Sequence, residues 1–310
     1  MNTVVGRFAP SPTGRLHAGN IFAALCAWLI AKSQDGEVVL RIEDLDAQRS
    51  KPAYASALQR DFEYLGLTWD RGPFFQSTRT QTYREAAEQL SRQGLLYPCF
   101  CTRADRRAAS APHGEEKRMH ACPCRKLSAK EGQQRVQQQG QMPAMRLIVP
   151  DKTYCFTDGL QGKYCQNLEA HCGDFIVQRA DGAFAYQLAV VIDDAEQGIS
   201  SVVRGADLLC STPQQLYLQD LLGFNHPHYH HIPLLVNAAG QRLSKRDQAA
   251  SIDEVRTRLK TPEAIIGFIA GTTGLTPTTQ PITPTQLLEV GTFSALRGKQ
   301  TIVWQEGDGF

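Results

Sequence analysis

The sequence contains no long apolar run and no clear excess of either charge. No segment has the roughly 18 consecutive apolar residues of a membrane-spanning helix, and the N-terminus lacks the basic-then-apolar pattern of a secretory signal. We therefore expect a soluble, cytoplasmic protein without a membrane partner. The 33 basic and 31 acidic side chains give a formal net charge of only +2. A nucleic-acid ligand would have to be met by a local basic patch rather than by the whole surface.

Cysteine occurs in an odd number, and the chain is long enough for a substantial core. With 310 residues, 42% of them hydrophobic, it can bury one large core or two modest ones. Four of the nine cysteines are clustered, which in a cytoplasmic protein indicates a metal site rather than disulfides. Cys155, Cys165 and Cys172 lie between expected strands without the spacing of metal ligands, so we expect them to pack in the core.

The N-terminal segment predicts a phosphate-binding loop that leads into a helix. Residues 4–8 have the pattern of a short buried strand, and two prolines and a glycine within residues 10–14 favour a turn after it. Asn20 can cap a helix whose apolar residues follow at helical spacing. The free N–H groups and the dipole of such a helix start favour an anion. Gly19 would let a nucleotide lie close to the backbone.

Two segments resemble the signature motifs of class I aminoacyl-tRNA synthetases. Residues 17–20, His-Ala-Gly-Asn, resemble the "HIGH" motif, and residues 240–247, Gly-Gln-Arg-Leu-Ser-Lys-Arg-Asp, resemble the "KMSKS" loop. The resemblance implies that His17, Gly19, Asn20 and Lys245 bind ATP. It also implies that His17 and Lys245 are catalytic, the lysine stabilising charge on the departing pyrophosphate. The alternatives are an ordinary helix-start turn and a solvated basic turn.

Other residues resemble the glutamate-specific branch of that family. The matching positions, which the resemblance implies bind L-glutamate, are Arg7, Phe8, Ala9, Pro10, Ser11, Glu43, Tyr186 and Arg204. Glu43 would face the amino group of the substrate. Arg7 and Arg204 would neutralise its second carboxylate, because a guanidinium is a planar, permanently charged fork. The alternatives are that Arg204 pairs with Asp207 and that Tyr186 packs in the core.

A basic segment between residues 97 and 130 interrupts the alternation of strands and helices. It holds eight Lys and Arg against three acids, and two cysteine-containing clusters joined by a loop, the usual arrangement of a structural zinc site. The pattern of zinc-bearing members of the resembled family maps onto Cys99, Cys101, His120 and Cys124. Cys122 is a rival for the fourth position, and buried cysteines without metal are the alternative.

The remaining pattern predicts further elements. We expect helices over residues 55–65 and 80–92, and a solvated helix or loop over the glutamine-rich residues 132–140. We expect strands over 37–44, 145–149 and 174–179, and a returning strand over 184–194 that forms a hairpin with the one before it. Four histidines between residues 226 and 231 precede an apolar strand, and we do not expect them to bind metal.

Together these features predict an α/β protein with the Rossmann-like fold of class I synthetases. We expect residues 1–96 and 186–250 to form the two halves of the catalytic domain. Residues 97–185 would form a zinc-containing, acceptor-domain-like insertion, and residues 251–310 a short helical segment. Only 65 residues follow Lys245, and residues 251–310 carry five basic and six acidic side chains. We therefore do not expect a separate anticodon-binding domain.

Such a chain resembles the glutamyl-Q tRNA(Asp) synthetases. The resemblance implies ATP-dependent activation of L-glutamate as glutamyl-adenylate, followed by transfer to queuosine in the anticodon loop of tRNA(Asp). ATP would carry Mg²⁺, the zinc would be structural, and the protein would be a monomer. The alternatives are a short glutamyl-tRNA synthetase that charges a tRNA 3′ end and a non-catalytic tRNA-binding paralogue.

Overall fold

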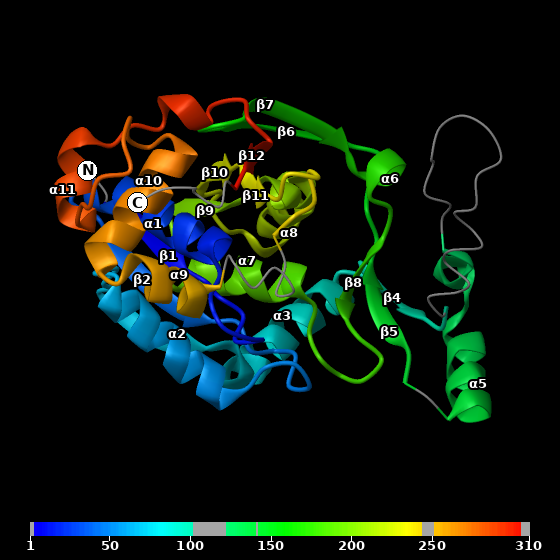
Figure 1. Ribbon diagram of the computed structural model, residues 1–310. Coiled ribbons are helices and arrows are strands. Elements are labelled where there is room, and N and C mark those ends of the chain that lie inside the picture. The colour runs from blue at the N-terminus through cyan, green and yellow to red at the C-terminus, as the bar shows by residue number, and fades with distance from the viewer. Residues whose placement is uncertain (1–2, 102–121, 141, 244–250, 305–310) are drawn as a thin grey trace.

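The computed structural model describes residues 3–101, 122–140, 142–243 and 251–304, and it has the α/β architecture expected from the sequence (Figure 1). The part expected to be the first half of the catalytic domain alternates strands and helices: β1 (Val5–Phe8), α1 (Ala18–Lys32), β2 (Glu37–Ile42), α2 (Pro52–Tyr64), β3 (Arg71–Phe75) and α3 (Thr80–Arg92). The three strands form a parallel sheet in the order β1-β2-β3. The alternation predicts this arrangement, because parallel neighbours require a crossover helix.

The part expected to be the second half of the catalytic domain places two further parallel strands, β9 and β10, next to β1. Its elements are α7 (Tyr186–Glu196), β9 (Ser201–Gly205), α8 (Thr212–Leu222), β10 (His228–Ile232) and β11 (Leu234–Val236). Strands β9 and β10 pair in parallel. The two halves meet where the Ser200 N–H donates to the Val5 carbonyl over 2.9 Å. The beginnings of β1 and β9 are thereby brought together, although Val5 and Ser200 lie 195 positions apart along the chain.

The returning strand expected over residues 184–194 is wrong, because this segment is helix α7. Seven consecutive residues of α7, Leu188 to Asp194, are buried, and the helix packs against α3 and α8. A helix that is buried on every side has no polar face, so its sequence shows no helical periodicity. Only an isolated bridge between Gln178 and Phe184 remains of the expected hairpin.

The insertion contains an antiparallel sheet and a long hairpin. Its elements are β4 (Leu96–Cys99), α5 (Ala129–Gln139), β5 (Ala144–Leu147), β6 (Thr153–Asp158), β7 (Gly162–Asn167), α6 (Leu168–His171) and β8 (Phe175–Gln178). Strands β4, β5 and β8 form one sheet, which lies to the right of the catalytic domain in Figure 1 together with α5. The β6–β7 hairpin returns toward the catalytic domain, where β6 packs against β10 and α8.

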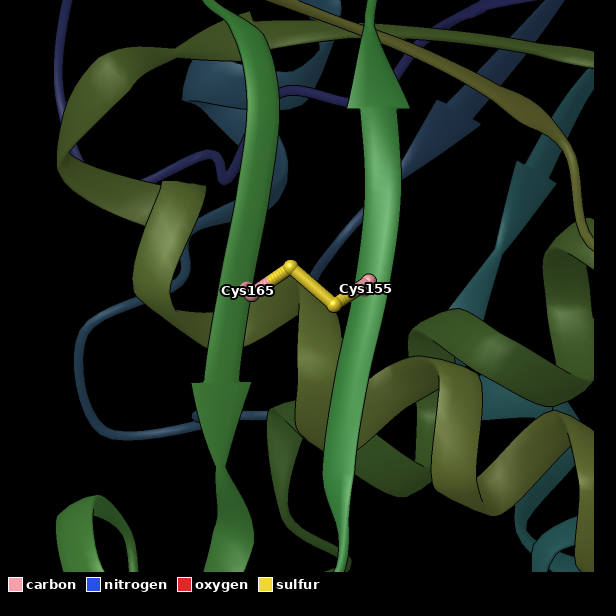
Figure 2. The surroundings of a disulfide bond; sticks show 2 residues. All are labelled: Cys155 and Cys165. Carbon is pink, nitrogen blue, oxygen red and sulfur yellow. A yellow bond between two sulfur atoms is a disulfide. The ribbon is translucent and has the colours of Figure 1, made fainter.

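Two of the cysteines expected in the core instead form a disulfide on this hairpin. Cys155 of β6 and Cys165 of β7 are directly opposite in the register and are bonded to each other (Figure 2). Both residues are exposed, so the expected core role is wrong for them. Their pairing depends on the strand register, which the spacing of the cysteines along the chain does not reveal. Cys172 is partly buried against the second core, which lies around α7.

The last part of the chain is mostly helical. It contains α9 (Ile252–Leu259), α10 (Pro262–Thr273), α11 (Pro284–Val290) and β12 (Thr301–Val303), which pairs with β11. Short 3₁₀ helices lie at Gln76–Arg79, Pro123–Lys126, Ala206–Ser211 and Ser294–Leu296. Apolar residues of α10 and α1 share one core, which includes Ile21, Leu25, Ile265 and Ile269. This core fixes α1, whose N-terminus borders the site described next.

Candidate active site and metal centre

A cavity of about 490 Å³ is lined by the ends of β1 and β9 and the beginning of α1. Carboxyl ends of parallel strands are where open α/β sheets bind ligands. The lining includes every described residue that the motifs assigned to glutamate or ATP: Arg7, Phe8, Ala9, Pro10, Ser11, His17, Gly19, Asn20, Glu43, Tyr186 and Arg204. Lys245 lies outside the described residues. Arg242 and Leu243, just before it, line the cavity.

The beginning of α1 is capped by His17 rather than by Asn20, so the expected cap is wrong by three residues. His17 has the extended backbone of an N-cap, and the Asn20 side chain accepts from the His17 N–H over 3.2 Å. A reciprocal capping box of this kind fixes both side chains. The first turn of α1 contains no acidic residue, so its positive dipole end faces the cavity without a carboxylate of its own. A Cβ at Gly19 would lie 3.2 Å from the His17 ring.

A buried ionic network includes Arg7, one of the residues that line the cavity. Asp194 of α7 accepts from Arg7 over 3.3 Å and from Arg41 over 2.8 Å. Arg7 also donates to the Val203 carbonyl over 3.0 Å. Burial alone would raise the pKa of Asp194, but Arg41 and Arg7 outweigh it and hold that pKa below its usual value. The sequence analysis missed the roles of Arg41 and Asp194, because they arise from contacts between distant parts of the chain.

The cavity is also lined by the carboxyl group of Glu43 and the neutral hydroxyl of Tyr186. Glu43 follows β2, and its carboxylate lies 3.4 Å from Arg41 Nη2. Burial raises the pKa of Glu43, while Arg41 and Arg7 partly offset that effect. Such a carboxylate is suited to a cationic ligand, because a bound ammonium would favour its ionised form. Burial also raises the pKa of Tyr186, so its hydroxyl stays neutral.

Arg204 is a buried cation whose described partners are all neutral. Its guanidinium donates to Gln215 Oε1 over 2.7 Å, to Thr212 Oγ1 over 2.8 Å and to His231 Nε2 over 3.0 Å. Within the described ranges no carboxylate forms an ion pair with it, and it is 6% exposed. The expected alternative, a pair with Asp207, is not formed, because Asp207 binds Arg242. A buried charge of this kind favours an anionic ligand.

The described residues on both sides of the KMSKS-like loop contact residues that line this cavity. On the N-terminal side, Arg242 pairs with Asp207. On the C-terminal side, Ser251 forms an isolated bridge with His17, and Asp253 accepts from Arg15 over 2.6 Å. The described residues on either side of positions 244–250 therefore both contact residues that line the cavity.

Four cysteines form a second centre in the insertion. The Sγ atoms of Cys99, Cys101, Cys122 and Cys124 all lie within 4.8 Å of one another. Cys122 lies 3.6 Å from both Cys99 and Cys101, and Cys101 lies 3.6 Å from Cys124. This group can hold a metal ion. His120 lies outside the described residues, whereas its rival Cys122 occupies the fourth position.

Comparisons with known proteins show the family to which the chain belongs. The family "tRNA synthetases class I (E and Q), catalytic domain" matches residues 3–285. A glutamyl-Q tRNA(Asp) synthetase from Nitratidesulfovibrio vulgaris is 44% identical over 289 residues, which cover 90% of this chain and 89% of the relative. The one from Neisseria meningitidis strain FAM18 is 46% identical over 84% of this chain and 89% of the relative. The chain belongs to the glutamyl-Q tRNA(Asp) synthetase family. As a member of this class I family it is a ligase.

Solved structures of larger synthetases share the fold. A glutamate tRNA ligase from Elizabethkingia meningosepticum, in complex with its amino acid, superposes with a TM-score of 0.80 at 24% identity, over 98% of this chain and 67% of that one. A glutamate-tRNA synthetase from Elizabethkingia anophelis gives a TM-score of 0.81 at 23% identity. The α/β fold expected from the sequence is thus confirmed. In the described part of the chain, no helix is long and apolar enough to cross a membrane.

Proposed function

We propose that this enzyme activates L-glutamate with ATP and transfers the glutamyl group to queuosine in the anticodon loop of tRNA(Asp). The observation that carries the glutamate part is Arg204, a buried cation with only neutral partners among the described residues. It suits the side-chain carboxylate of glutamate and disfavours the neutral amide of glutamine. The acceptor part is supported by relatives of similar length that are named for it.

The first step would be formation of glutamyl-adenylate. An oxygen of the glutamate α-carboxylate attacks the α-phosphorus of ATP, the bond to the bridging oxygen breaks, and pyrophosphate leaves. Glu43 would hold the substrate ammonium, and Arg204 its side-chain carboxylate. The start of α1, with His17, Gly19 and Asn20, would bind phosphates, and Lys245 would stabilise the departing pyrophosphate. Mg²⁺ that accompanies ATP would neutralise part of the charge on its phosphates.

The second step would be transfer of the glutamyl group. A hydroxyl of the queuosine cyclopentene ring attacks the activated carbonyl carbon, and AMP leaves with the bonding electron pair. The enzyme would contribute by positioning the two reactants, without a covalent enzyme intermediate. The insertion would contact tRNA phosphates through its basic side chains. Lys126, Lys130 and Arg135 of the described part are exposed and are available for this role.

The metal of the insertion would be zinc in a structural role. In a tetrahedral site with Zn–S distances of about 2.3 Å, neighbouring sulfur atoms are about 3.8 Å apart. The three 3.6 Å separations found here are close to that value. Four thiolates leave no open position for a water or substrate. We therefore propose Cys122 as the fourth ligand in place of the expected His120.

The acceptor is tested by transfer of labelled glutamate to matched tRNAs. We expect acid-precipitable label on queuosine-containing tRNA(Asp) and on its isolated anticodon stem-loop, but not on the same tRNA with guanosine at that position. Nucleoside mass spectrometry then identifies the modified base. Charging of tRNA(Glu) at its 3′ end, with none on queuosine-containing tRNA, would instead assign a short glutamyl-tRNA synthetase. A cytoplasmic location and a monomeric state are part of the proposal, the latter testable by light scattering.

A further inference from the structure

His231 lies between Arg204 and a buried carboxylate that no motif indicated. His231 is on β10 and has 0% exposure. Its Nε2 atom is 3.0 Å from Arg204 Nε, and its Nδ1 atom is 2.6 Å from Asp158 Oδ2. Asp158 is the last residue of β6, so it comes from the insertion. Strands β9 and β10 therefore meet strand β6 through these side chains.

The contact with Arg204 determines which nitrogen of His231 carries the proton. A guanidinium Nε–H can only donate, so His231 Nε2 must accept and the proton must be on Nδ1. The Nδ1–H group then donates to Asp158. Burial lowers the pKa of His231, and the nearby Arg204 and Arg7 act in the same direction against the pull of Asp158. The ring is therefore neutral, in the tautomer that Arg204 requires.

Asp158 is itself held in place as an anion. Its Oδ1 atom accepts from the N–H groups of Leu160 and Gln161, each over 2.9 Å, and its two oxygens accept from the His231 N–H over 3.1 Å. Burial alone would raise the pKa of Asp158, but these hydrogen bonds outweigh it and keep that pKa below its usual value. The following Gly159 allows β10 to lie close, since a Cβ there would be 2.2 Å from the His230 ring.

We propose that Asp158 and His231 are positioning residues that orient Arg204 toward the glutamate side chain. Asp158 fixes the tautomer of His231, and His231 fixes Arg204 Nε, so that the guanidinium, whose Nη1 donates to Gln215, keeps its place in the lining of the cavity. This inference rests on the proposed function, in which Arg204 binds the carboxylate. Neither residue contacts the substrate.

Asp158→Asn tests the tautomer without changing the size of the side chain. The backbone N–H groups would keep the amide oxygen at the Oδ1 position, which places the NH₂ group against His231 Nδ1. His231 would then carry its proton on Nε2 and oppose Arg204 Nε–H, donor against donor. We expect kcat/KM for glutamate in ATP–pyrophosphate exchange to fall on the order of 10- to 100-fold, the usual effect of one lost hydrogen bond to a charged group. The KM for ATP should stay within about twofold.

His231 provides a second pair of variants that does not depend on Asp158→Asn folding well. His231→Gln keeps an oxygen acceptor near the position of Nε2, whereas His231→Phe keeps the ring but removes the acceptor. We expect His231→Gln to retain most of the glutamate kcat/KM and His231→Phe to lose it. Asp151→Asn is the matched control, because exposed Asp151 precedes the same hairpin and binds only the Asn167 amide among its described side-chain contacts.

A double-mutant cycle separates this role from a merely structural one. If Asp158 acts through Arg204, adding Asp158→Asn to Arg204→Met should lower kcat/KM for glutamate no further. Additive losses, or equal values for His231→Gln and His231→Phe, would overturn the proposal. If Arg204→Met itself leaves glutamate kinetics unchanged, the proposed function of the cavity fails. If Arg204→Met is impaired and Asp158→Asn is not, only the positioning role fails.

Discussion

Replacing Cys122 by serine should remove one of the zinc ligands, whereas replacing His120 by alanine should not. The geometry gives this expectation, since the Cys122 sulfur lies 3.6 Å from two other cysteine sulfurs, close to the edge of a zinc–thiolate tetrahedron. Zinc binding to structural sites of this kind is worth roughly 10–16 kcal/mol. An equal share for each of four ligands is about 3 kcal/mol, so the zinc Kd of Cys122→Ser should rise by about 100-fold.

Purified enzyme loaded with one equivalent of zinc is the sample for this measurement. Metal per chain is read by atomic emission, and the Kd by competition with a chelator of known affinity. Cys210→Ser is the matched control, because this cysteine is exposed and lies outside the cluster. Full zinc affinity in Cys122→Ser combined with its loss in His120→Ala would refute the four-cysteine assignment. Enzyme that carries no zinc and is unaffected by chelators would refute the metal site as a whole.

Four further outcomes are expected. Arg204→Met should lower kcat/KM for glutamate by about 10²- to 10³-fold in ATP–pyrophosphate exchange, because the substrate carboxylate would then be buried without a partner. Gly19→Ala should raise the KM for ATP by about 10-fold and leave that for glutamate unchanged, since its methyl group meets the helix-cap imidazole at 3.2 Å. Lys245→Ala should lower kcat by about 10²-fold in single-turnover assays if it stabilises the leaving pyrophosphate. Burial lowers the pKa values of His230 and His231 in the folded state. As the pH falls, the unfolded chain therefore takes up protons before the folded chain does. The contribution of these histidines to the free energy of unfolding is present above about pH 6.5 and is lost below it. Denaturant titrations at several pH values would measure this loss.

Local patterns in the sequence predicted most of the elements but not helix α7. The strand expected over residues 4–8 and the helix over residues 80–92 correspond to β1 and α3. Helix α7 has a continuous apolar run with adjacent β-branched residues, Val190 and Val191, and such a run suits a buried strand equally well. Packing against α3 and α8 decides the outcome, and the sequence does not show which elements will be neighbours.

Residues of the cavity that belong to a sequence motif could be predicted from the sequence. Residues that reach it only through long-range contacts could not. His17, Glu43 and Arg204 each belong to a short recognisable segment, and all three line the same cavity. Asp158 and His231 lie 73 residues apart, and neither has a neighbouring pattern that indicates a ligand. The apolar strand after the histidines gave no sign of the contact between His231 and Arg204.

The chain contains both free clustered thiols, which need a reductant, and a disulfide, which a reductant would break. A reductant that protects the four clustered thiols during purification would also open the exposed bond between Cys155 and Cys165. The protein prepared with reductant would then be heavier by two hydrogen atoms than the protein prepared without it. The first strand of the hairpin that carries this bond ends at Asp158. Intact-mass analysis of each preparation should therefore accompany any comparison of glutamate kinetics between laboratories.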